Sequence, residues 1–439
     1  MLAPLRPRSA WALKGGSMTT TDEAVPVDAA LSPPTEKAPA KLVAAMALAQ
    51  FGLSIALLTP VTASLTIKVQ TLVGTDNVIA VFGTVSSIGA LAAFLANPIF
   101  GRISDRTTGR FGRRRPWLLI GIVGLAASEL VLALVPNVVG IAIAWFAAQA
   151  FANAAQAALM ASIADQIPPA QRGRVSGLIG VMQQSSKLGA AYVAQFLVAN
   201  MLLMFLVPAV IGIVFLLPFL LLLPDRPLQA RPPREGLRAV LKTFWLSPRR
   251  YPDFAYAWAS RFMITMALYL FMTYRLLYMQ YELDLSLARA TAVMATGVLL
   301  YTVTLALAGQ AAGWLSDKVG TRKPFVITAS VIFSIGLVLL TQAHTAGGFY
   351  VAEVVLGLGF GIYMGVDLAL VIDVLPGQDD SAKNLGVLNM ANVLPQTLAP
   401  GIGALLIGVG GHNYDLLLSV AAAVCAVGAL LIVPIRKVR

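Results

Sequence analysis

Apolar stretches of about 20 residues recur along the whole sequence, and most of the charged residues lie in the segments between them. A helix needs about 20 apolar residues to cross the roughly 30 Å hydrocarbon core of a bilayer. Such stretches occupy residues 42–67, 77–101, 116–136, 138–164, 254–280, 290–316, 324–343, 347–375, 384–409 and 416–435. Residues 175–223 are long enough for two more helices, with a turn near Asn200. We therefore predict an all-α membrane protein with twelve transmembrane helices.

The composition indicates that lipid is the main solvent of this chain. Charged residues make up 12% of the sequence and hydrophobic residues 58%, whereas soluble domains carry about 25% charged residues. A formal net charge of +12 would suggest nucleic acid in a soluble protein, but here the positive charges lie between apolar stretches, so we expect no nucleic-acid partner. One cysteine, Cys425, and two histidines, His344 and His412, form no pattern for a disulfide framework or a metal site.

The distribution of lysine and arginine predicts the orientation in the membrane. With twelve spans, every strongly basic segment falls on the same side, which is the cytoplasmic side by the positive-inside rule. Six arginines lie between Arg102 and Arg115, whereas the opposite loops contain little beyond Lys68 and Arg289. We therefore expect an integral protein of the plasma (cytoplasmic) membrane with both termini in the cytoplasm.

The two halves of the sequence repeat each other. GRISDRTTGRFGRRRP begins at Gly101 and GWLSDKVGTRKP begins at Gly313, and the two copies of the aspartate lie 212 residues apart. We predict a disordered cytoplasmic tail at 1–40, a six-helix half at 41–224, a basic cytoplasmic linker at 225–253, a second six-helix half at 254–435 and a short cytoplasmic tail at 436–439. Two pseudo-symmetric halves of this kind are typical of carriers that bind their substrate near the midplane, between the halves.

At these residues the sequence resembles the major facilitator superfamily, over essentially the whole chain from 42 to 435. The residues that carry the resemblance in the loop after the second span are Gly101, Ser104, Asp105, Arg106, Gly112, Arg113 and Arg114. The arginine-rich end of this loop, together with Asn153, Gln156 and the Arg172-Gly173-Arg174 segment, is similar to the glycoside-pentoside-hexuronide and sucrose-type branch. The resemblance implies the major facilitator (MFS) fold, a monomer and transport of a small solute. The fifth span contains no proline, which departs from the Gly-Pro-rich motif of drug/proton antiporters.

The charged residues of the repeated loops are candidates for a cytoplasmic gate. Asp105 lies at a helix end, where it can accept hydrogen bonds from the free N–H groups at the start of a neighbouring helix. The arginines can pair with Asp165 when the cytoplasmic side is closed and release it on opening. The alternative is that these charges only set the orientation. The predicted gate comprises Asp105, Arg106, Arg113, Arg114, Asp165, Arg172, Arg174, Asp317, Lys318, Arg322 and Asp373.

Polar side chains within the apolar stretches are candidates for substrate binding, because such groups are costly in lipid and usually face a cavity. Amides can both donate and accept hydrogen bonds, which suits the hydroxyl groups of a sugar. The alternative is hydrogen bonding between helices. The candidate substrate-binding residues are Gln149, Asn153, Gln156, Gln183, Gln184, Lys187, Arg261, Tyr269, Tyr363, Asn389, Asn392 and Gln396.

Ionisable residues within the spans indicate how transport is driven. A proton-coupled carrier needs a carboxylate whose surroundings change during transport, and Asp367 and Glu129 are the candidates. Lys187 and Arg261 can pair with one of them or bind an anionic substrate. Arg275 and Glu353 lie near the outer helix ends, where we expect them to extend to the membrane interface.

We predict a carrier and not an enzyme. The sequence has no Gly-rich phosphate-binding loop with Lys-Ser/Thr, so we expect no cofactor and an energy source in a proton or other cation gradient. The leading interpretation is proton-coupled symport of a sugar or glycoside. The alternatives are proton-coupled export of an antibiotic or other amphiphile and a membrane receptor without transport activity.

Overall fold

The structure is a computed structural model that describes residues 34, 36–225, 227–228, 247–374, 381–409 and 411–436, and every regular element in these residues is a helix. Side chains are described for all of them except residues 368, 372, 373 and 381–386. The elements are α1 (Ala40–Thr59), η1 (Pro60–Ser64), α2 (Leu65–Asp105), α3 (Arg115–Leu134), α4 (Val138–Gln166), α5 (Pro169–Leu197), α6 (Met201–Leu222), α8 (Pro252–Tyr281), α9 (Leu287–Val319), α10 (Lys323–Thr341), α11 (Ala346–Val374), α12 (Ser381–Gly408) and α13 (Tyr414–Leu430).

The first two membrane spans are joined through a single glycine. Gly74 has φ 74° and ψ −177° inside α2, a conformation that L side chains rarely adopt. The chain therefore reverses at Gly74, and α1, η1 and the start of α2 form the first span, while the rest of α2 forms the second. The first span extends beyond the predicted end at residue 67 because Lys68 is buried and its Nζ donates to the carbonyl oxygen of Ala133, at 2.8 Å.

Within the described residues, nine helical stretches are long and apolar enough to cross a membrane. The first of them, Ala40–Asp105, holds the two spans joined at Gly74. α5 carries polar side chains that lower its hydropathy, and α13 has only 17 residues. With these two helices, the fold has the twelve spans predicted from the sequence, in two six-helix halves.

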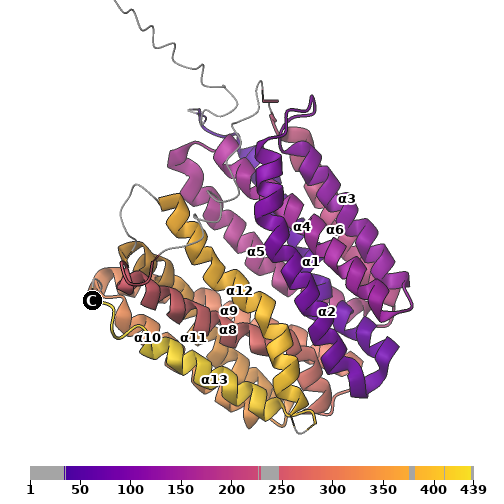
Figure 1. Cartoon of the computed structure of the whole chain (residues 1–439), viewed down its shortest axis with the longest axis vertical. Coiled ribbons are helices and arrows are strands. Elements are labelled where there is room, and N and C mark those ends of the chain that lie inside the picture. Colours follow the sequence, from indigo (N-terminus) through magenta and orange to yellow (C-terminus); the bar gives the residue numbers. More distant parts are fainter. Residues whose placement is uncertain are drawn as a thin grey trace, which may run out of the picture.

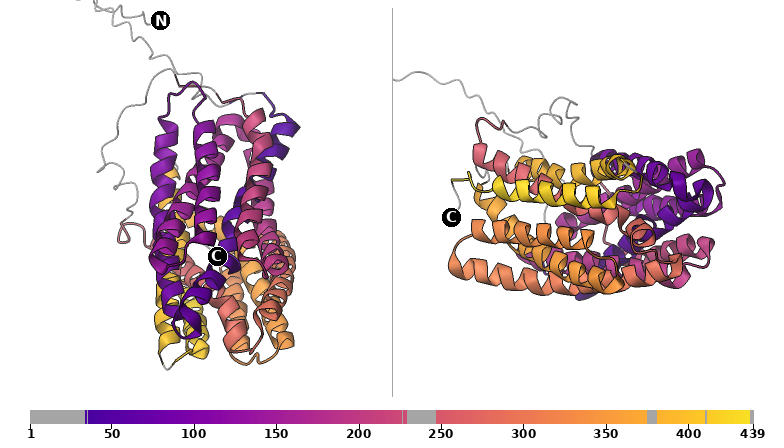
Figure 2. Two further views of the ribbon diagram at one scale, coloured as in Figure 1. Left: turned by 90° about the vertical axis from the view of Figure 1, so that its right-hand side faces the viewer. Right: turned by 90° about the horizontal axis from the view of Figure 1, so that it is seen from below.

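The two halves lie side by side (Figures 1 and 2). In the first half α1 packs on α5 and α6, and α4 packs on α2 and α3. In the second half α11 packs on α9 and α10, and α8 packs on α12 and α13. The halves meet mainly through α2 with α12 and α5 with α9, and also where α8 contacts η1.

The helix ends fall into two sets. We call the end that carries the loops between α2 and α3 and between α9 and α10 the basic end, because it contains the two repeated charged loops. We call the opposite end, which contains Gly74 and the loop between α8 and α9, the far end. The predicted tail at 1–40 and the predicted linker at 225–253 lie mostly outside the described residues.

Contacts between the halves are found toward the far end. The Tyr281 hydroxyl of α8 donates to the Thr75 carbonyl oxygen at 3.0 Å. Along α2 and α12, a Cβ added at Gly83 would lie 2.6 Å from the Cβ of Ala404, which shows how closely these helices approach.

At the basic end, by contrast, α5 has open space beside it. A Cβ added at Gly173, Gly177 or Gly180 would meet no atom within 4 Å. The described contacts between the halves are thus found toward the far end, and these three glycines of α5 have no neighbouring atom toward the basic end.

Candidate functional site

An ion pair joins α8 to α11 near the basic end. Arg261 Nη1 lies 2.8 Å from Asp367 Oδ2, and both side chains are mostly buried. The Arg261 Nε also donates to Asn392 Oδ1 on α12, at 2.9 Å. Tyr363 is buried one helical turn before Asp367 on α11 and adjoins its carboxylate. Three of the predicted substrate-binding residues and one predicted coupling carboxylate are thus brought together.

A second ion pair joins the same two helices near the far end. Arg275 Nε lies 3.1 Å from Glu353 Oε1, and Arg275 Nη2 donates to Glu353 Oε2 at 3.1 Å. Arg275 is 5% exposed and Glu353 is 0% exposed. The guanidinium also lies over the rings of Phe271 and Tyr301, with 5.2 and 5.9 Å to the ring centroids. The expectation that these residues extend to the interface is wrong, because each finds a buried partner on the facing helix.

The two ion pairs have matching spacings. Arg261 and Arg275 are fourteen residues apart on α8, and Glu353 and Asp367 are fourteen residues apart on α11. Fourteen residues make almost four complete turns of an α-helix, or ~21 Å. The two arginines therefore lie on one face of α8, and the two acidic residues lie on one face of α11. Antiparallel α8 and α11 are therefore held together at two depths of the membrane.

The polar side chains of α5 and α12 are mostly accessible. Gln183 and Lys187 on α5 and Asn389 and Gln396 on α12 are exposed, and no hydrogen bond or ion pair joins any of these four to another described residue. Lys187 lies on α5, the helix of the first half that packs on α9 of the second half. Gln184 and Tyr269 are half-buried.

The amides of α4 are used mainly within the first half. Gln156 Nε2 donates to Gln50 Oε1 on α1 at 3.0 Å, and Asn97 Nδ2 on α2 donates to Asn153 Oδ1 at 3.4 Å. Gln149 is 6% exposed. Interhelical hydrogen bonding, the alternative considered for this stripe, therefore accounts for Asn153 and Gln156 in the described conformation.

Glu129 lies apart from the other candidates. It is completely buried on α3, and neither carboxylate oxygen has a hydrogen-bond partner among the described residues. Its helix packs on α4 and α6, both of the first half. Of the two predicted coupling carboxylates, only Asp367 belongs to the polar cluster that involves α12.

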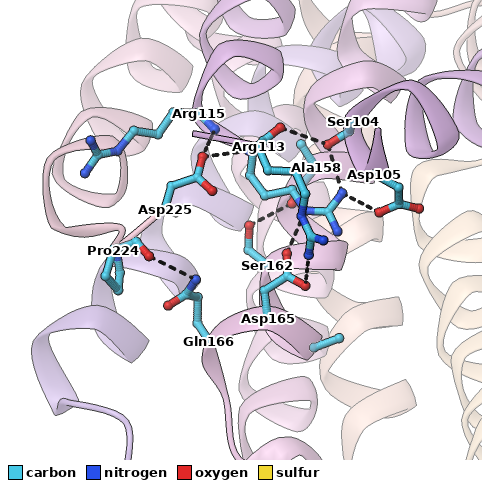
Figure 3. Close-up of polar contacts among 12 residues, drawn as sticks. Ser104, Asp105, Arg113, Arg115, Ala158, Ser162, Asp165, Gln166, Pro224 and Asp225 are labelled. Carbon is cyan, nitrogen blue, oxygen red and sulfur yellow. Dashed lines mark hydrogen bonds and ion pairs between the residues drawn. The ribbon is translucent and has the colours of Figure 1, made fainter. Parts of the chain in front are cut away.

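The arginines of the first repeated loop form a buried cluster (Figure 3). Arg113 Nη2 lies 2.5 Å from Asp165 Oδ1, and Arg114 Nε lies 2.7 Å from Asp165 Oδ2. Arg114 Nη1 also lies 2.7 Å from Asp105 Oδ1 and donates to Ser104 Oγ at 2.9 Å. All these residues belong to the first half. These ion pairs therefore join segments of the first half and do not extend to the second half.

The cap of α3 comes from a residue that the sequence did not single out. The Arg114 and Arg115 backbone N–H groups donate to Asp225 Oδ2, at 2.6 and 2.7 Å (Figure 3). A carboxylate at this position is stabilised by the positive end of the helix dipole. Asp105, for which such a role was predicted, instead pairs with Arg114. Gly112 has φ 95°, and a Cβ there would lie 2.3 Å from Asp225 Oδ2, so this turn requires glycine.

The remaining predicted gate residues serve separate local contacts. Arg172 donates to the Ala164 and Ile167 carbonyl oxygens at the end of α4, and Arg174 is exposed. In the second repeated loop the contacts are an ion pair of Arg322 with Asp317, at 2.7 Å, and Lys318 over the ring of Trp314. Arg106 is half-buried, and the side chain of Asp373 lies outside the described residues.

The buried ion pairs and the interhelical amide contacts give the helix bundle a partly polar interior. In the part of the chain that the structure describes, no group of three or more His, Cys, Asp or Glu side chains is placed to hold a metal ion. The family model of the Major Facilitator Superfamily matches residues 42–310 and 296–439. The chain belongs to this superfamily. It is an integral membrane protein of a transporter family, as the sequence resemblance implied.

Known proteins resemble this superfamily member to different extents. The chain is 28% identical over 154 residues to "Putative multidrug resistance protein MdtD" of Citrobacter koseri, covering 35% of this chain and 32% of that protein. It is 26% identical over 134 residues to the protein of the same name from Cronobacter sakazakii, covering 30% and 28%. The aligned region thus spans about a third of the length of these curated relatives.

The solved structure of a point mutant of the nucleoside transporter NupG matches 90% of this chain and 100% of its own, with a TM-score of 0.72 and 14% sequence identity. At this identity the similarity shows the shared fold alone. It supports the two-half architecture for nearly the whole chain.

Proposed function

We propose that this chain is a secondary active transporter that moves a small polar solute by alternating access, as a proton-coupled sugar or glycoside symporter. Its basic end faces the cytoplasm of a cell bounded by the plasma membrane, and both termini lie on that side. In this orientation the hydrogen bond between Tyr281 and Thr75, which joins the two halves, lies toward the outside. The unit of transport is a monomer, because each chain supplies both halves.

The contacts of Arg261 with Asp367 and Asn392 support the proposal that transport is coupled to proton binding. Arg261 is shared between a carboxylate on α11 and an amide on α12. α12 is also one of the helices through which the two halves meet. A proton on Asp367 removes the charge that holds the guanidinium, so Arg261 and α12 become free to rearrange. Proton binding is thereby linked to a helix at the boundary between the halves.

The accessible amides support a polar substrate. Gln183, Asn389 and Gln396 lie on α5 and α12 without hydrogen-bond partners among the described residues. Amides offer both donors and acceptors, which hydroxyl groups of a sugar can satisfy. Tyr269, half-buried on α8, offers an aromatic face for a sugar ring.

Export of an amphiphile is the second candidate function. It is favoured by the partial similarity to proteins named for multidrug resistance. Such a carrier needs an acid in its cavity but a more apolar lining than the free amides on α5 and α12 provide. The lining therefore favours the polar substrate.

Uptake into proteoliposomes tests the proposal. A panel of radiolabelled monosaccharides, disaccharides and glycosides is offered with and without an inward proton gradient, and with a sodium gradient as a further arm. We expect proton-driven accumulation of a sugar by the wild type. Asp367→Asn is expected to lose accumulation and to retain exchange of internal for external sugar.

The matched control is Asp415→Asn, which removes an exposed carboxylate at the start of α13 and is expected to transport normally. Failure of every sugar to accumulate under any gradient would contradict the sugar proposal and favour the exporter. Accumulation that survives in Asp367→Asn would assign coupling to another residue.

A further inference from the structure

The hydrogen bond that joins the halves at the far end is made by a tyrosine whose ring stacks on two others. The Tyr281 hydroxyl donates to the Thr75 carbonyl oxygen of the first half at 3.0 Å. The Tyr281 ring stacks on the His412 imidazole, with 4.7 Å between the ring centroids and 29° between the planes. It also stacks on the Tyr414 ring, with 6.3 Å between centroids and 17° between planes. We call Thr75, Tyr281, His412 and Tyr414 the far-end latch.

The backbone holds His412 in an uncommon conformation. Its φ is 60°, in the left-handed region that few residues other than glycine adopt and in which histidine is enriched. The His412 carbonyl oxygen accepts from the Tyr414 N–H at 3.0 Å, and the Asn413 N–H donates to the Ile407 carbonyl oxygen at 2.9 Å. These bonds fix the loop before α13 and hold the imidazole against the Tyr281 ring.

The imidazole of His412 contacts Tyr281 by ring stacking. Its Nε2 atom is buried and has no hydrogen-bond partner among the described residues. An unperturbed histidine changes its charge between pH 5 and 8. His412 can therefore gain a positive charge while its stacking partner stays the same.

The charged groups beside the latch are mostly acidic. In the first half Asp76 directly follows Thr75, and its Oδ1 atom accepts from the Thr75 hydroxyl at 3.3 Å. In the second half Glu282 directly follows Tyr281, and Asp415 directly follows Tyr414. The other ionisable side chains near this end are Lys68, Tyr278, Asp284, Arg289, His344 and Tyr350. Contact between the halves therefore brings Asp76 toward two carboxylates of the second half, which repel it.

We propose that His412 is the positioning residue of the far-end latch and that a proton on its imidazole strengthens the contact between the halves. Tyr281, His412 and Tyr414 all belong to the second half, so their stacking does not depend on the first half. What changes when the halves separate is the distance from His412 to Asp76. A proton on His412 attracts Asp76 and offsets the repulsion by the second-half carboxylates. Closure of the far end should therefore increase as the pH falls from 8 to 5.

The expected effect is moderate, because Asp76 is exposed to solvent. Two unit charges ~10 Å apart shift an equilibrium about twofold in water, and about fourfold at half the dielectric constant of water. The equilibrium between contact and separation of the halves exists without substrate, so this role of His412 does not rest on the proposed transport function. In the proposed orientation the far end faces outside, and the latch would respond to external pH.

Distances between spin labels test this role. Cys425 is the only cysteine of the chain and is buried, so labels attach to introduced cysteines. Val139→Cys at the start of α4 and Gly347→Cys at the start of α11 place one label on each half, at exposed positions of the far end. Double electron–electron resonance in nanodiscs then gives the ratio of closed to open distances at pH 8 and pH 5.

Two substitutions fix the charge at position 412. His412→Asn is neutral and tolerates the left-handed conformation, and His412→Arg is a permanent cation that can stack on the Tyr281 ring. Neither can gain a proton in this range. We therefore expect the change in the closed-to-open ratio between pH 8 and pH 5 to be about twofold to fourfold larger in the wild type than in either variant. Titration of Asp367 or Glu282 contributes equally to all three proteins.

The sign of the effect has its own readout. At both pH values His412→Arg should show a closed-to-open ratio about twofold to fourfold higher than His412→Asn. Asp76→Asn, which removes the first-half charge, should reduce the pH-dependent change to that of His412→Asn. The matched control is His344→Gln, which removes the other histidine of the chain, an exposed one, and should keep the full change of the wild type.

The series is also measured with Tyr281→Phe, which keeps the ring and removes its hydroxyl, so that an open population is present for comparison. A pH-dependent change in the wild type no larger than that in His412→Asn, in both backgrounds, would overturn the inference. A change that is lost with His344→Gln would assign the effect to His344 and overturn it equally. No solute or gradient is needed, so failure of sugar uptake would contradict the proposed function and leave this result intact.

Discussion

Neutralising one partner of the Arg275–Glu353 ion pair should destabilise the protein strongly, whereas replacing both should cost much less. The two side chains are 5% and 0% exposed and make two contacts of 3.1 Å. Breaking a buried pair by removing one partner costs about 3–5 kcal/mol, because the other charge stays buried without compensation. Because both side chains are buried, solvent screens their interaction only slightly, and this energy range needs no large reduction for screening. Glu353→Gln should therefore lower the free energy of unfolding by about 3–5 kcal/mol.

The double variant Arg275→Met with Glu353→Gln leaves no charge behind. Because no charge is left buried without its partner, the cost of the double variant should fall well below the sum of the costs of the two single variants. The expected coupling energy is about 2–3 kcal/mol, at the upper end for residues in contact. Arg275→Met alone also loses the contacts with the Phe271 and Tyr301 rings, each worth about 1 kcal/mol.

Reversible unfolding in mixed micelles, by titration of a denaturing detergent, gives the four free energies of this cycle. Tryptophan fluorescence or helical circular dichroism reports the folded fraction. A matched control is Glu282→Gln, which removes a carboxylate at the end of α8 that is partly exposed. Additive costs in the double variant would show that the two residues act independently, and the description of them as one buried pair would then be wrong.

Two further predictions concern backbone and interface contacts. Gly112→Ala should destabilise the protein by about 1–3 kcal/mol, because the alanine would be strained at φ 95° and its Cβ would displace Asp225. The control is Gly109→Ala, whose Cβ would meet no neighbouring atom. Thermal unfolding of this control should match that of the wild type. Tyr281→Phe removes the hydrogen bond to the Thr75 carbonyl oxygen and should shift the conformational equilibrium toward opening at the far end by about 1 kcal/mol, or roughly fivefold. Distances between spin labels on the far ends of the two halves measure that shift, and an unchanged distribution would contradict it.

The sequence predicted the helices well because the thickness of the membrane imposes the length of each span. Most of the observed helix ends lie within a few residues of the predicted ones. The clearest exception is the first span, where Lys68 ended the apolar run in the sequence but is buried through its bond to the Ala133 carbonyl oxygen. Hydropathy alone could not show that a lysine would find a backbone partner.

The contacts within the site were harder to predict, because they depend on the register of helices that are distant in the sequence. The pairing of Arg261 with Asp367 was one of several alternatives, beside pairing with Glu129 and binding of an anionic substrate, and the pairing of Arg275 with Glu353 was missed. The equal spacing of fourteen residues between the two basic residues and between the two acidic residues was available as a signal. Reading it required knowing that α8 faces α11, which the sequence does not show.

The two ion pairs between α8 and α11 have a consequence for the mechanics of transport. A single contact would act as a pivot, about which two helices can tilt, whereas two contacts ~21 Å apart oppose both tilting and sliding. A shift of α8 by one residue along α11 would displace both pairs by about 1.5 Å at once. We therefore expect any bending that accompanies transport to occur in helices other than α8 and α11. As long as both ion pairs remain formed, α8 and α11 move together as one rigid unit.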